Sequence, residues 1–384
     1  MSEKLHVLWT PSWYPTAQSP LNGSFFLEQI NMLRAAHMDV GVLNVSTQPG
    51  RQWRPHEPEL DASEWTIRES APSIPFGLAP FERYSLSFAA IRAARLYADN
   101  YGVPDVIHAH STFPGTVTAR ALAKYWNIPY GVTEHRPSVL NLPRLRPRNS
   151  LRRRVLKDAD FRLAVSNVFA RQLEDAYGCE FGTVTNPVPD HFFTAKRKPH
   201  DHFTFIHISN LERLKRAEEV VDAFALIQAD HPHTRLKIVG GTPDTLAAVK
   251  THVQRRGLTH LLTMTGPVPR SQIADALADT DCLVLVSQTE SAGVVFAEAQ
   301  SMGIPCIASN TPGGSYMVTA DSGIVVPIDD SVALIDAMRR MVTDANDSYP
   351  AQKLRKQAWE RFGSKKFVQD HRQIYEAAIR AHKR

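Results

Sequence analysis

Two glutamates, Glu290 and Glu298, stand where an apolar strand-like run gives way to a helical pattern. Residues 282–286 are apolar, Glu290 follows in a loop, and Gly293 allows close backbone approach before the helix that carries Glu298. The free N–H groups at the start of such a helix favour a phosphate. Carboxylates at two depths can accept hydrogen bonds from neighbouring hydroxyls of one ligand. Glutamate is also common at solvated helix starts, so the spacing alone leaves both interpretations open.

Lys215 and His135 are further candidates for chemistry. Lys215 precedes an amphipathic segment rich in Glu and Ala, where an ordinary exposed lysine is the alternative. As a fixed cation it would stabilise charge on an anionic leaving group, a role worth about 3–4 kcal/mol, whereas a helix end contributes about 0.3–1 kcal/mol. His135 ends an apolar run between Glu134 and Arg136, a place where a lone histidine is more often structural.

His108 and His110 form a His-x-His pair that is also found in metal sites. No third and fourth ligand stands at a suitable spacing, so we expect no metal. Burial is the preferred interpretation for His108, and a position lining the ligand site for His110.

The densest positive charge lies in residues 144–157, with six arginines and one lysine among fourteen residues. It includes Arg144, Arg146 and Arg148. Such a cluster can hold a phosphate-bearing ligand or an anionic membrane surface. Nucleic acid is a weaker alternative, because no aromatic residue interleaves the cluster. A solvated helix face with ion pairs remains the plain alternative.

Alternating strands and helices must position these residues. Strand-like runs occur at 5–9, 40–45, 106–108, 130–133, 161–165, 203–208, 236–239, 261–265, 282–286, 306–309 and 324–326. Segments with helical spacing lie between them, which predicts an α/β protein with two doubly wound, Rossmann-like parallel sheets. Two prolines within residues 185–191 mark the domain boundary. Ligands of such sheets bind at the carboxyl ends of the strands, and a pair of domains is expected to place the site in the cleft between them.

Bulk composition agrees with two soluble α/β domains. The composition is 43% hydrophobic and 22% charged. A chain of 384 residues is too long to form a single ordinary core. No apolar run approaches the roughly 18–20 residues that span a bilayer, and the start lacks a secretion signal, so we expect a cytoplasmic protein. The three cysteines, with no close spacing, favour structural thiols over disulfides or zinc. A net charge of +5 suits an anionic ligand without demanding one.

The ordered combination of motifs resembles the GT-B retaining glycosyltransferases of family 4. Glu-x7-Glu followed by Ala-x-x-x-Gly-x-Pro at 290–305 is similar to that family's signature. Further segments that resemble it, in the family's order, are 13–15, 22–26, 105–110, 132–135, 186–192, 211–215, 266–268, 311–314 and 321–327. The likeness covers nearly the whole chain.

This resemblance implies a retaining, metal-independent transfer of a sugar from a nucleoside diphosphate sugar, a UDP- or GDP-sugar, to an acceptor hydroxyl, with no cofactor. Glu298 would hold the ribose, the 266–268 loop the base, and Lys215 the diphosphate, while Glu290 and His135 position the sugar. The implied donor contacts are Gly23, Ser24, Asn210, Arg213, Lys215, Val268, Ser291, Ala292, Gly293, Val294, Val295 and Glu298. The weaker acceptor candidates are His110, Arg144, Arg146 and Arg148.

The resemblance also assigns the domains: an acceptor-binding domain at 1–187, a sugar-nucleotide-binding domain at 188–360, and a helix at 361–384 that packs back on the first. A helix break is expected near Gly363. The chain departs from the family where Asn210 replaces a frequent Arg, where Ala292 replaces an aromatic residue, and where no Glu follows Gly313-Gly314.

Two other functions stay open: a sugar-nucleotide epimerase of the same fold, and a catalytically silent sugar-nucleotide-binding protein. Cell-envelope polysaccharide or glycolipid synthesis is the expected pathway, with the arginine cluster able to bring the protein to the inner face of the membrane. The sequence does not decide the sugar, the base or the acceptor.

Overall fold

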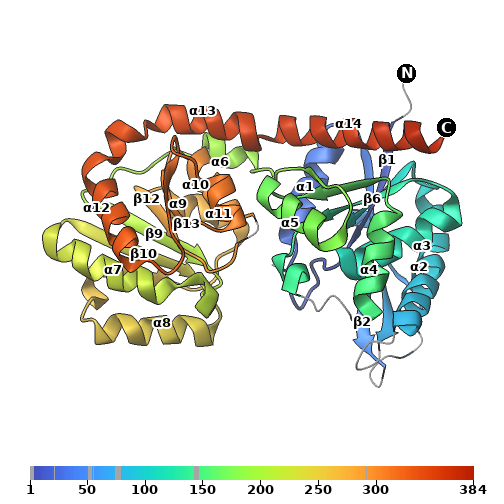
Figure 1. The fold of residues 1–384 in the computed structure, drawn as a ribbon, viewed down its shortest axis with the longest axis horizontal. Helices are drawn as coiled ribbons and strands as arrows, with labels where there is room; N and C mark the ends of the chain where they lie inside the picture. The colour runs from blue at the N-terminus through green and yellow to red at the C-terminus, as the bar shows by residue number, and fades with distance from the viewer. Residues whose placement is uncertain are drawn as a thin grey trace. The chain divides into compact units, whose positions relative to one another are not determined.

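The computed structural model describes residues 4–20, 22–50, 54, 56–73, 79–141, 147–290 and 292–384; the side chains of 79, 80, 137, 141, 147–150 and 346 are outside the description. The chain forms two compact units (Figure 1). The first comprises Met1–Val184 and Phe367–Arg384, and the second Thr185–Lys366. The sequence places this boundary between residues 187 and 188, within the same proline-containing segment.

The second unit is a six-stranded parallel sheet in the order β11-β10-β9-β12-β13-β14. Its strands are β9 (Phe203–Ser209), β10 (Thr234–Gly240), β11 (Leu262–Thr265), β12 (Cys282–Leu285), β13 (Cys306–Ser309) and β14 (Gly323–Val326). Its helices are α6 (Asp190–Thr194), α7 (Ala217–Asp230), α8 (Pro243–Arg255), α9 (Ile273–Leu277), α10 (Val294–Ser301), α11 (Pro312–Met317), α12 (Ser331–Ser348) and α13 (Ala351–Phe362). The direction of winding reverses between β9 and β12, and doubly wound sheets bind ligands at such a switch point.

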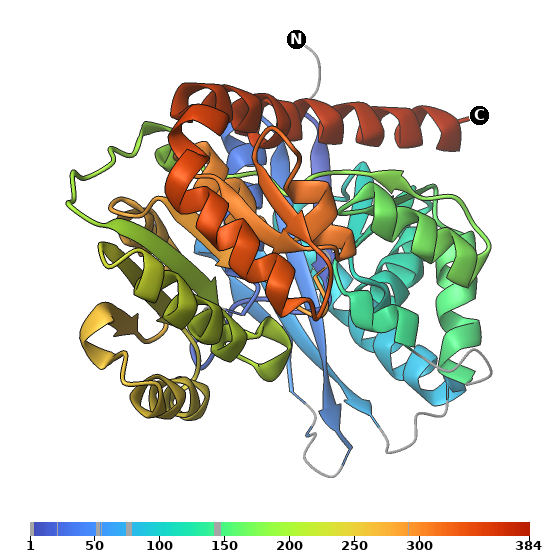
Figure 2. The same cartoon turned by 60° about the vertical axis from the view of Figure 1, so that its left-hand side comes forward.

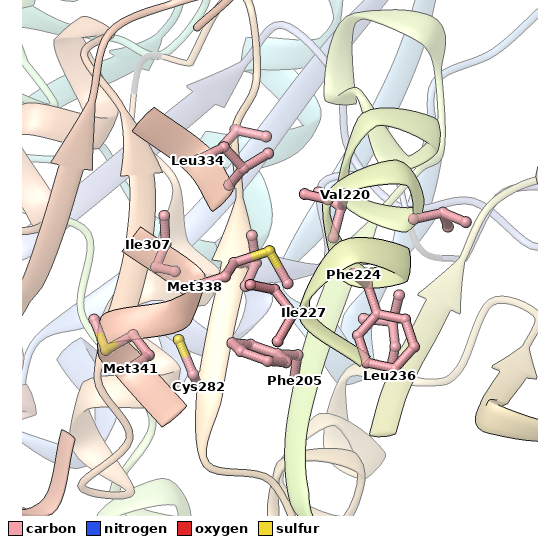
Figure 3. Packing of buried hydrophobic residues seen from close by; sticks show 14 of the residues in the cluster. Phe205, Val220, Phe224, Ile227, Leu236, Cys282, Ile307, Leu334, Met338 and Met341 are labelled. Carbon is pink, nitrogen blue, oxygen red and sulfur yellow. The ribbon is translucent and has the colours of Figure 1, made fainter. Parts of the chain in front are cut away.

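Alternate residues of these strands feed two apolar layers. Phe205 of β9 points to a layer covered by α7, α8 and α12, and its neighbour Ile206 to a layer covered by α6, α9, α10 and α13. α7 and α12 lie side by side on the first of these faces (Figures 1 and 2). Figure 3 shows Phe224 and Ile227 of α7 packed with Met338 of α12 over Phe205. The sheet is therefore buried on both faces, as an all-parallel sheet requires.

The first unit has an eight-stranded sheet in the order β3-β4-β2-β1-β5-β6-β7-β8, parallel except for the β3–β4 pair. Its strands are β1 (His6–Pro11), β2 (Asp39–Pro49), β3 (Glu59–Asp61), β4 (Thr66–Ser73), β5 (Val106–His110), β6 (Tyr130–Glu134), β7 (Phe161–Ala164) and β8 (Gly182–Thr183). Its helices are α1 (Ser24–Ala35), α2 (Ala79–Tyr101), α3 (Val117–Trp126), α4 (Pro147–Lys157), α5 (Asn167–Tyr177) and most of α14 (Ser364–His382). The winding reverses between β1 and β5, and the two sheets together confirm the predicted fold class.

The strands β3, β4 and β8 were not expected from the sequence. β4 carries Arg68 and Glu69 in succession, which hides its apolar pattern. Glu69 is nevertheless buried, and it bonds Arg92 Nε at 2.8 Å and His56 Nε2 at 2.8 Å. A paired carboxylate can occupy a buried strand position that a pattern of residue types assigns to solvent.

The last helix completes the first unit. α14 follows α13 after the predicted break at Gly363 and places Phe367 and Tyr375 in the apolar core with Trp9 and Phe26. In the part of the chain that the structure describes, no helix is both long and apolar enough to cross a membrane.

Tyr375 is the centre of a buried hydrogen-bond chain. Its hydroxyl accepts from Trp9 Nε1 at 3.2 Å and lies 2.7 Å from Nδ1 of His108, whose Nε2 lies 2.8 Å from Thr133 Oγ1. Burial holds the pKa of His108 well below its ordinary value, so the ring is neutral. Because the Tyr375 hydroxyl accepts from Trp9, we place its own hydrogen on the bond to Nδ1, so that the hydrogen of His108 lies on Nε2 toward Thr133.

Tyr375→Phe should lower the free energy of unfolding by about 2 kcal/mol, because it leaves the indole N–H of Trp9 and Nδ1 of His108 buried without their partner. Urea denaturation measures this. Tyr84→Phe is the matched control: Tyr84 is 67% exposed, and its change should stay within about 0.5 kcal/mol. An equal change in the free energy of unfolding for the two variants would contradict the hydrogen bonds described for Tyr375.

Candidate active site

The loops that leave β9 and β12 meet at the switch point of the second unit. Lys215 Nζ bonds Glu290 Oε2 at 2.7 Å, and the backbone N–H of Gln288 donates to the carbonyl of Leu214 at 2.8 Å. The N–H of Gly313 donates to the carbonyl of Glu290 at 2.7 Å, so the loop after β13 holds the same turn. Three consecutive loops of the sheet edge thus converge on Glu290.

Gly293 sets the entry into α10. It adopts the left-handed conformation with φ of 56°, and its N–H donates to Glu290 Oε1 at 3.1 Å. A Cβ at this position would lie 2.6 Å from the ring of Phe296 and 3.2 Å from Cγ of Glu290. Only glycine fits both the backbone and the space. The turn therefore holds Glu290 beside the helix start.

Glu298 lies further along α10 and is 2% exposed. Arg270 Nη2 lies 2.6 Å from its Oε1. Arg270 begins a short 3₁₀ turn directly after the 266–268 loop that the sequence assigned to a nucleotide base. The ion pair ties that loop to the helix. Arg270 was not among the residues predicted from the sequence, where an Arg two positions beyond Val268 was the available signal.

A neutral histidine supports the turn that carries Lys215. His207 Nδ1 lies 3.0 Å from the carbonyl of Val284, and its Nε2 lies 2.8 Å from Ser209 Oγ, which accepts from the N–H of Leu211. Burial, opposed by the Val284 bond and aided by Lys215, lowers the pKa of His207 to about 4. The neutral ring donates to the carbonyl and accepts from Ser209, so it joins β12 to the loop after β9.

The remaining donor candidates of this unit differ in exposure. Asn210 and Arg213 are exposed, whereas Val268, Ala292, Val294 and Val295 are half-buried. Ser291 lies outside the described residues. The neighbouring Arg216 is buried and pairs with Glu219 and Asp329, so these two carboxylates compensate its charge.

In the first unit, Gly23 and His135 lie in the loops after β1 and β6, beside His110 at the end of β5. Gly23 is the N-cap of α1 with φ of 81°, and a Cβ there would lie 3.0 Å from Cδ1 of Trp13. Ser24 follows, half-buried, as the first residue of α1. The ring of Trp13 lies 6.3 Å from that of His135 and carries the guanidinium of Arg136 3.7 Å above it. The aromatic ring of Trp13 and the guanidinium of Arg136 therefore lie beside His135.

His110 determines how His135 presents its ring. His110 is 1% exposed, and its Nδ1 lies 3.1 Å from Nε2 of His135. Among the described residues, His110 Nε2 has no hydrogen-bond partner. A proton there would be a buried orphan donor, so the proton belongs on Nδ1 and is donated to His135. His135 then accepts at Nε2 and carries its own hydrogen on Nδ1.

Burial lowers the pKa of His135 to about 3, with smaller contributions from Arg136 and His371, and lowers that of His110 well below its ordinary value. Both rings are neutral near pH 7. Neutral imidazoles suit hydrogen bonding to a polar, uncharged ligand.

Glu134 is a buried carboxylate that the sequence analysis mentioned only as a neighbour of His135. It is fully buried and accepts from the backbone N–H groups of Thr112, His135 and Arg136 at 2.8–2.9 Å. Three N–H donors compensate its charge. Glu134 therefore fixes the loop that orients His135. Its place at the carboxyl end of β6 was the signal available in the sequence.

The acceptor candidates are less well defined. His110 bonds His135, and its part in acceptor binding stays a prediction. Arg144 and Arg146 lie outside the described residues, and Arg148 stands in α4 with its side chain outside the description. Among the predicted residues, Lys215 and Gly293 both contact Glu290 in the second unit, and His110 contacts His135 in the first.

The sequence of each unit matches a model of a known protein family. Residues 190–361 match the model described as "Glycosyl transferases group 1", and residues 23–190 match "Glycosyltransferase Family 4". Together the two matches run through both units. The chain belongs to the group 1 glycosyltransferases.

The sequences of two relatives match this glycosyltransferase over most of its length. N-acetyl-alpha-D-glucosaminyl L-malate synthase of Bacillus anthracis is 26% identical, over 79% of this chain and 82% of that protein. The putative teichuronic acid biosynthesis glycosyltransferase TuaC of Bacillus subtilis is 24% identical, over 88% of this chain and 89% of that protein.

Solved structures show that this glycosyltransferase has the GT-B fold. Sucrose-phosphate synthase of Thermosynechococcus elongatus superposes with a TM-score of 0.74 at 18% identity, covering 98% of this chain and all of that one. HepE of Anabaena, solved in complex with UDP and glucose, superposes with a TM-score of 0.71 at 17% identity, covering 97% of this chain and all of that one.

Replacing Gly293 tests the turn that holds Glu290. Gly293→Ala imposes a left-handed alanine, which costs about 1–2 kcal/mol, and drives a methyl into Phe296. Gly257→Ala imposes the same strain at φ of 69° with nothing within 4 Å of the added Cβ. In urea denaturation, Gly293→Ala should lose at least about 1 kcal/mol more stability than Gly257→Ala. A smaller or reversed difference would show that the turn relaxes freely.

Proposed function

We propose that this glycosyltransferase moves a sugar, with retention of configuration, from a nucleoside diphosphate sugar to an acceptor hydroxyl. The single observation that carries the proposal is the Lys215–Glu290 pair at the β9/β12 switch point, 2.7 Å apart beside the start of α10. A cation, a carboxylate and a helix start at one point suit a ligand with both phosphate and hydroxyl groups.

Lys215 is proposed to bind the diphosphate. Its ammonium has three donors, and the bond to Glu290 uses one of them. Among the described residues Nζ has no second partner, so the others can reach phosphate oxygens, where a fixed cation stabilises the charge that develops as the bond to the sugar breaks. The start of α10 adds a favourable field of about 0.3–1 kcal/mol. Because these groups supply positive charge, we propose that the transfer needs no metal and no cofactor.

Glu290 and Glu298 are proposed to divide the donor between them. Glu290 is held by Lys215 and Gly293 near the diphosphate, so its role is to accept from sugar hydroxyls. Glu298 is nearly buried and linked through Arg270 to the 266–268 loop, which suits a ribose beside the base. Ala292 leaves more room next to Glu290 than an aromatic side chain would.

His135 is proposed to contact the transferred sugar from the first unit. Its ring is neutral, and the tautomer that His110 imposes places its hydrogen on Nδ1. A neutral donor binds a sugar hydroxyl without the charge of an imidazolium. Glu134 and Trp13 hold the loop and the ring in place.

The pathway we propose is cell-envelope polysaccharide or glycolipid synthesis, on the cytoplasmic side of the membrane. The name of TuaC refers to teichuronic acid biosynthesis, and HepE was solved with UDP and glucose, which supports a UDP-sugar over a GDP-sugar. The basic segment at 144–157 is proposed to hold a phosphate-bearing acceptor or the anionic membrane surface.

A panel of sugar nucleotides tests the function directly. A donor that binds the native state raises the melting temperature in proportion to the logarithm of its concentration above Kd. The donor so identified is then incubated with candidate acceptors, and the anomeric configuration of the product is read by NMR. Isomerisation of the donor in the absence of acceptor would replace transferase with epimerase, and an inverted product would refute retention.

Lys215→Ala and Glu290→Ala should each lower kcat/KM for transfer by about 10²–10³-fold while the protein stays folded. Lys237→Ala is the matched control. Lys237 has the same 21% side-chain exposure as Lys215 and is paired with Asp279, but it lies on β10 away from the switch point. Its turnover should be unchanged. Near-normal turnover in either site variant would overturn the assignment of the site.

A further inference from the structure

The outward face of α2 is aromatic. Tyr84 and Phe88 stand one turn apart and are 67% and 72% exposed, and Phe81 beside them is 39% exposed. Arg95 continues the same exposed line. Few large hydrophobic side chains among the described residues are as exposed as these two rings.

The opposite face of α2 is apolar as well. Leu86, the four alanines between positions 89 and 94, and Tyr97 are buried against the sheet. A helix that is apolar on both sides is ordinarily covered on both sides. Clustered exposed aromatics of this kind mark an interaction surface.

Two apolar hollows flank the ridge formed by Tyr84 and Phe88. One, of about 390 Å³, lies among α2, α3 and α4, and its walls include Ile91, Val117 and Leu151. The other, of about 270 Å³, lies on the side of β4, and Phe81 and Phe88 line it. Tyr84 lines both. The ridge and hollows form one corrugated apolar surface.

Positive charge surrounds this surface. Arg83 and Lys124 line the larger hollow, and Arg83 lies 5.1 Å from the ring centroid of Tyr84. On α4, Arg153, Arg154 and Lys157 are exposed. The nearby acidic Asp158 bonds Arg120 Nε at 2.7 Å, so its charge is compensated. An apolar centre with a cationic rim is complementary to a bilayer that carries anionic head groups.

We propose that the face formed by α2, α3 and α4 docks on an anionic lipid bilayer, with Tyr84 and Phe88 inserted at the interface and Arg83, Lys124 and the α4 cations on the head groups. The phenol ring of Tyr84, with its polar hydroxyl, favours the water–lipid boundary, and the phenyl ring of Phe88 adds apolar area for insertion. The long basic side chains extend from the apolar centre toward phosphates. This contact would add a second, apolar anchor to the charge of the 144–157 segment.

A bilayer explains the observations better than a second copy of the chain. Two copies that met through this face would bring like charges on Arg83, Lys124 and α4 together, which is unfavourable. A bilayer instead supplies opposite charge around an apolar interior. Self-association is therefore an outcome for the experiment to detect.

The test uses the full chain without donor, so that its result is independent of the proposed transfer. Co-sedimentation is measured at low salt with phosphatidylcholine vesicles that contain or lack phosphatidylglycerol. Binding should require the anionic lipid and weaken as salt is raised. The Tyr84→Ser/Phe88→Ser variant should lower the partition coefficient by about tenfold or more.

Two further variants make the result decisive. Leu226→Ser, on α7 of the second unit and 54% exposed, is the matched control and should bind as the unchanged protein does. Arg83→Glu/Lys124→Glu keeps both rings and should also lose binding. Absence of binding to anionic vesicles, or binding that both double variants retain, would overturn the proposal. So would a dimer in light scattering that the serine variant converts to a monomer.

Discussion

The ion pair between Lys215 and Glu290 is the interaction on which the proposed site depends. It joins the loop after β9 to the loop after β12, the two strands between which the winding of the sheet reverses. Both side chains are mostly buried, and removing either would leave a charge that water cannot fully solvate. The N–H of Gly293 donates to the carboxylate of Glu290, and the N–H of Gly313 donates to its backbone carbonyl. A ligand therefore meets a site whose charges are already placed.

Buried polar groups hold loops in place in both units. Glu134 collects three backbone N–H groups beneath His135, and His207 connects a carbonyl of β12 to Ser209 before the Lys215 turn. Each group is compensated by fixed partners, so it costs little to bury and resists displacement. Neutral histidines hold loops in this way because one ring nitrogen donates while the other accepts.

Much of the fold and the outline of the site could be predicted from the sequence, because strand and helix periodicities survive in a doubly wound sheet and Glu290, Gly293 and Glu298 are close in the chain. Arg270 could not be found in this way, because its pairing with Glu298 depends on how the 266–268 loop returns to α10. β4 was missed since its glutamate is paired across 23 residues with Arg92. Arg270 and β4 were missed because they depend on contacts between segments far apart in the sequence, which local patterns do not reveal.

The end of the chain shows how far such distant contacts extend. Tyr375 lies 366 residues after Trp9 and 267 after His108, yet its hydroxyl joins them in the core of the first unit. His108 stands on β5, and two residues later His110 sets the tautomer of His135. A helix formed from the last residues thus completes the packing behind the candidate sugar-binding histidine. The first unit cannot satisfy its own buried hydrogen bonds until the whole second unit has been synthesised.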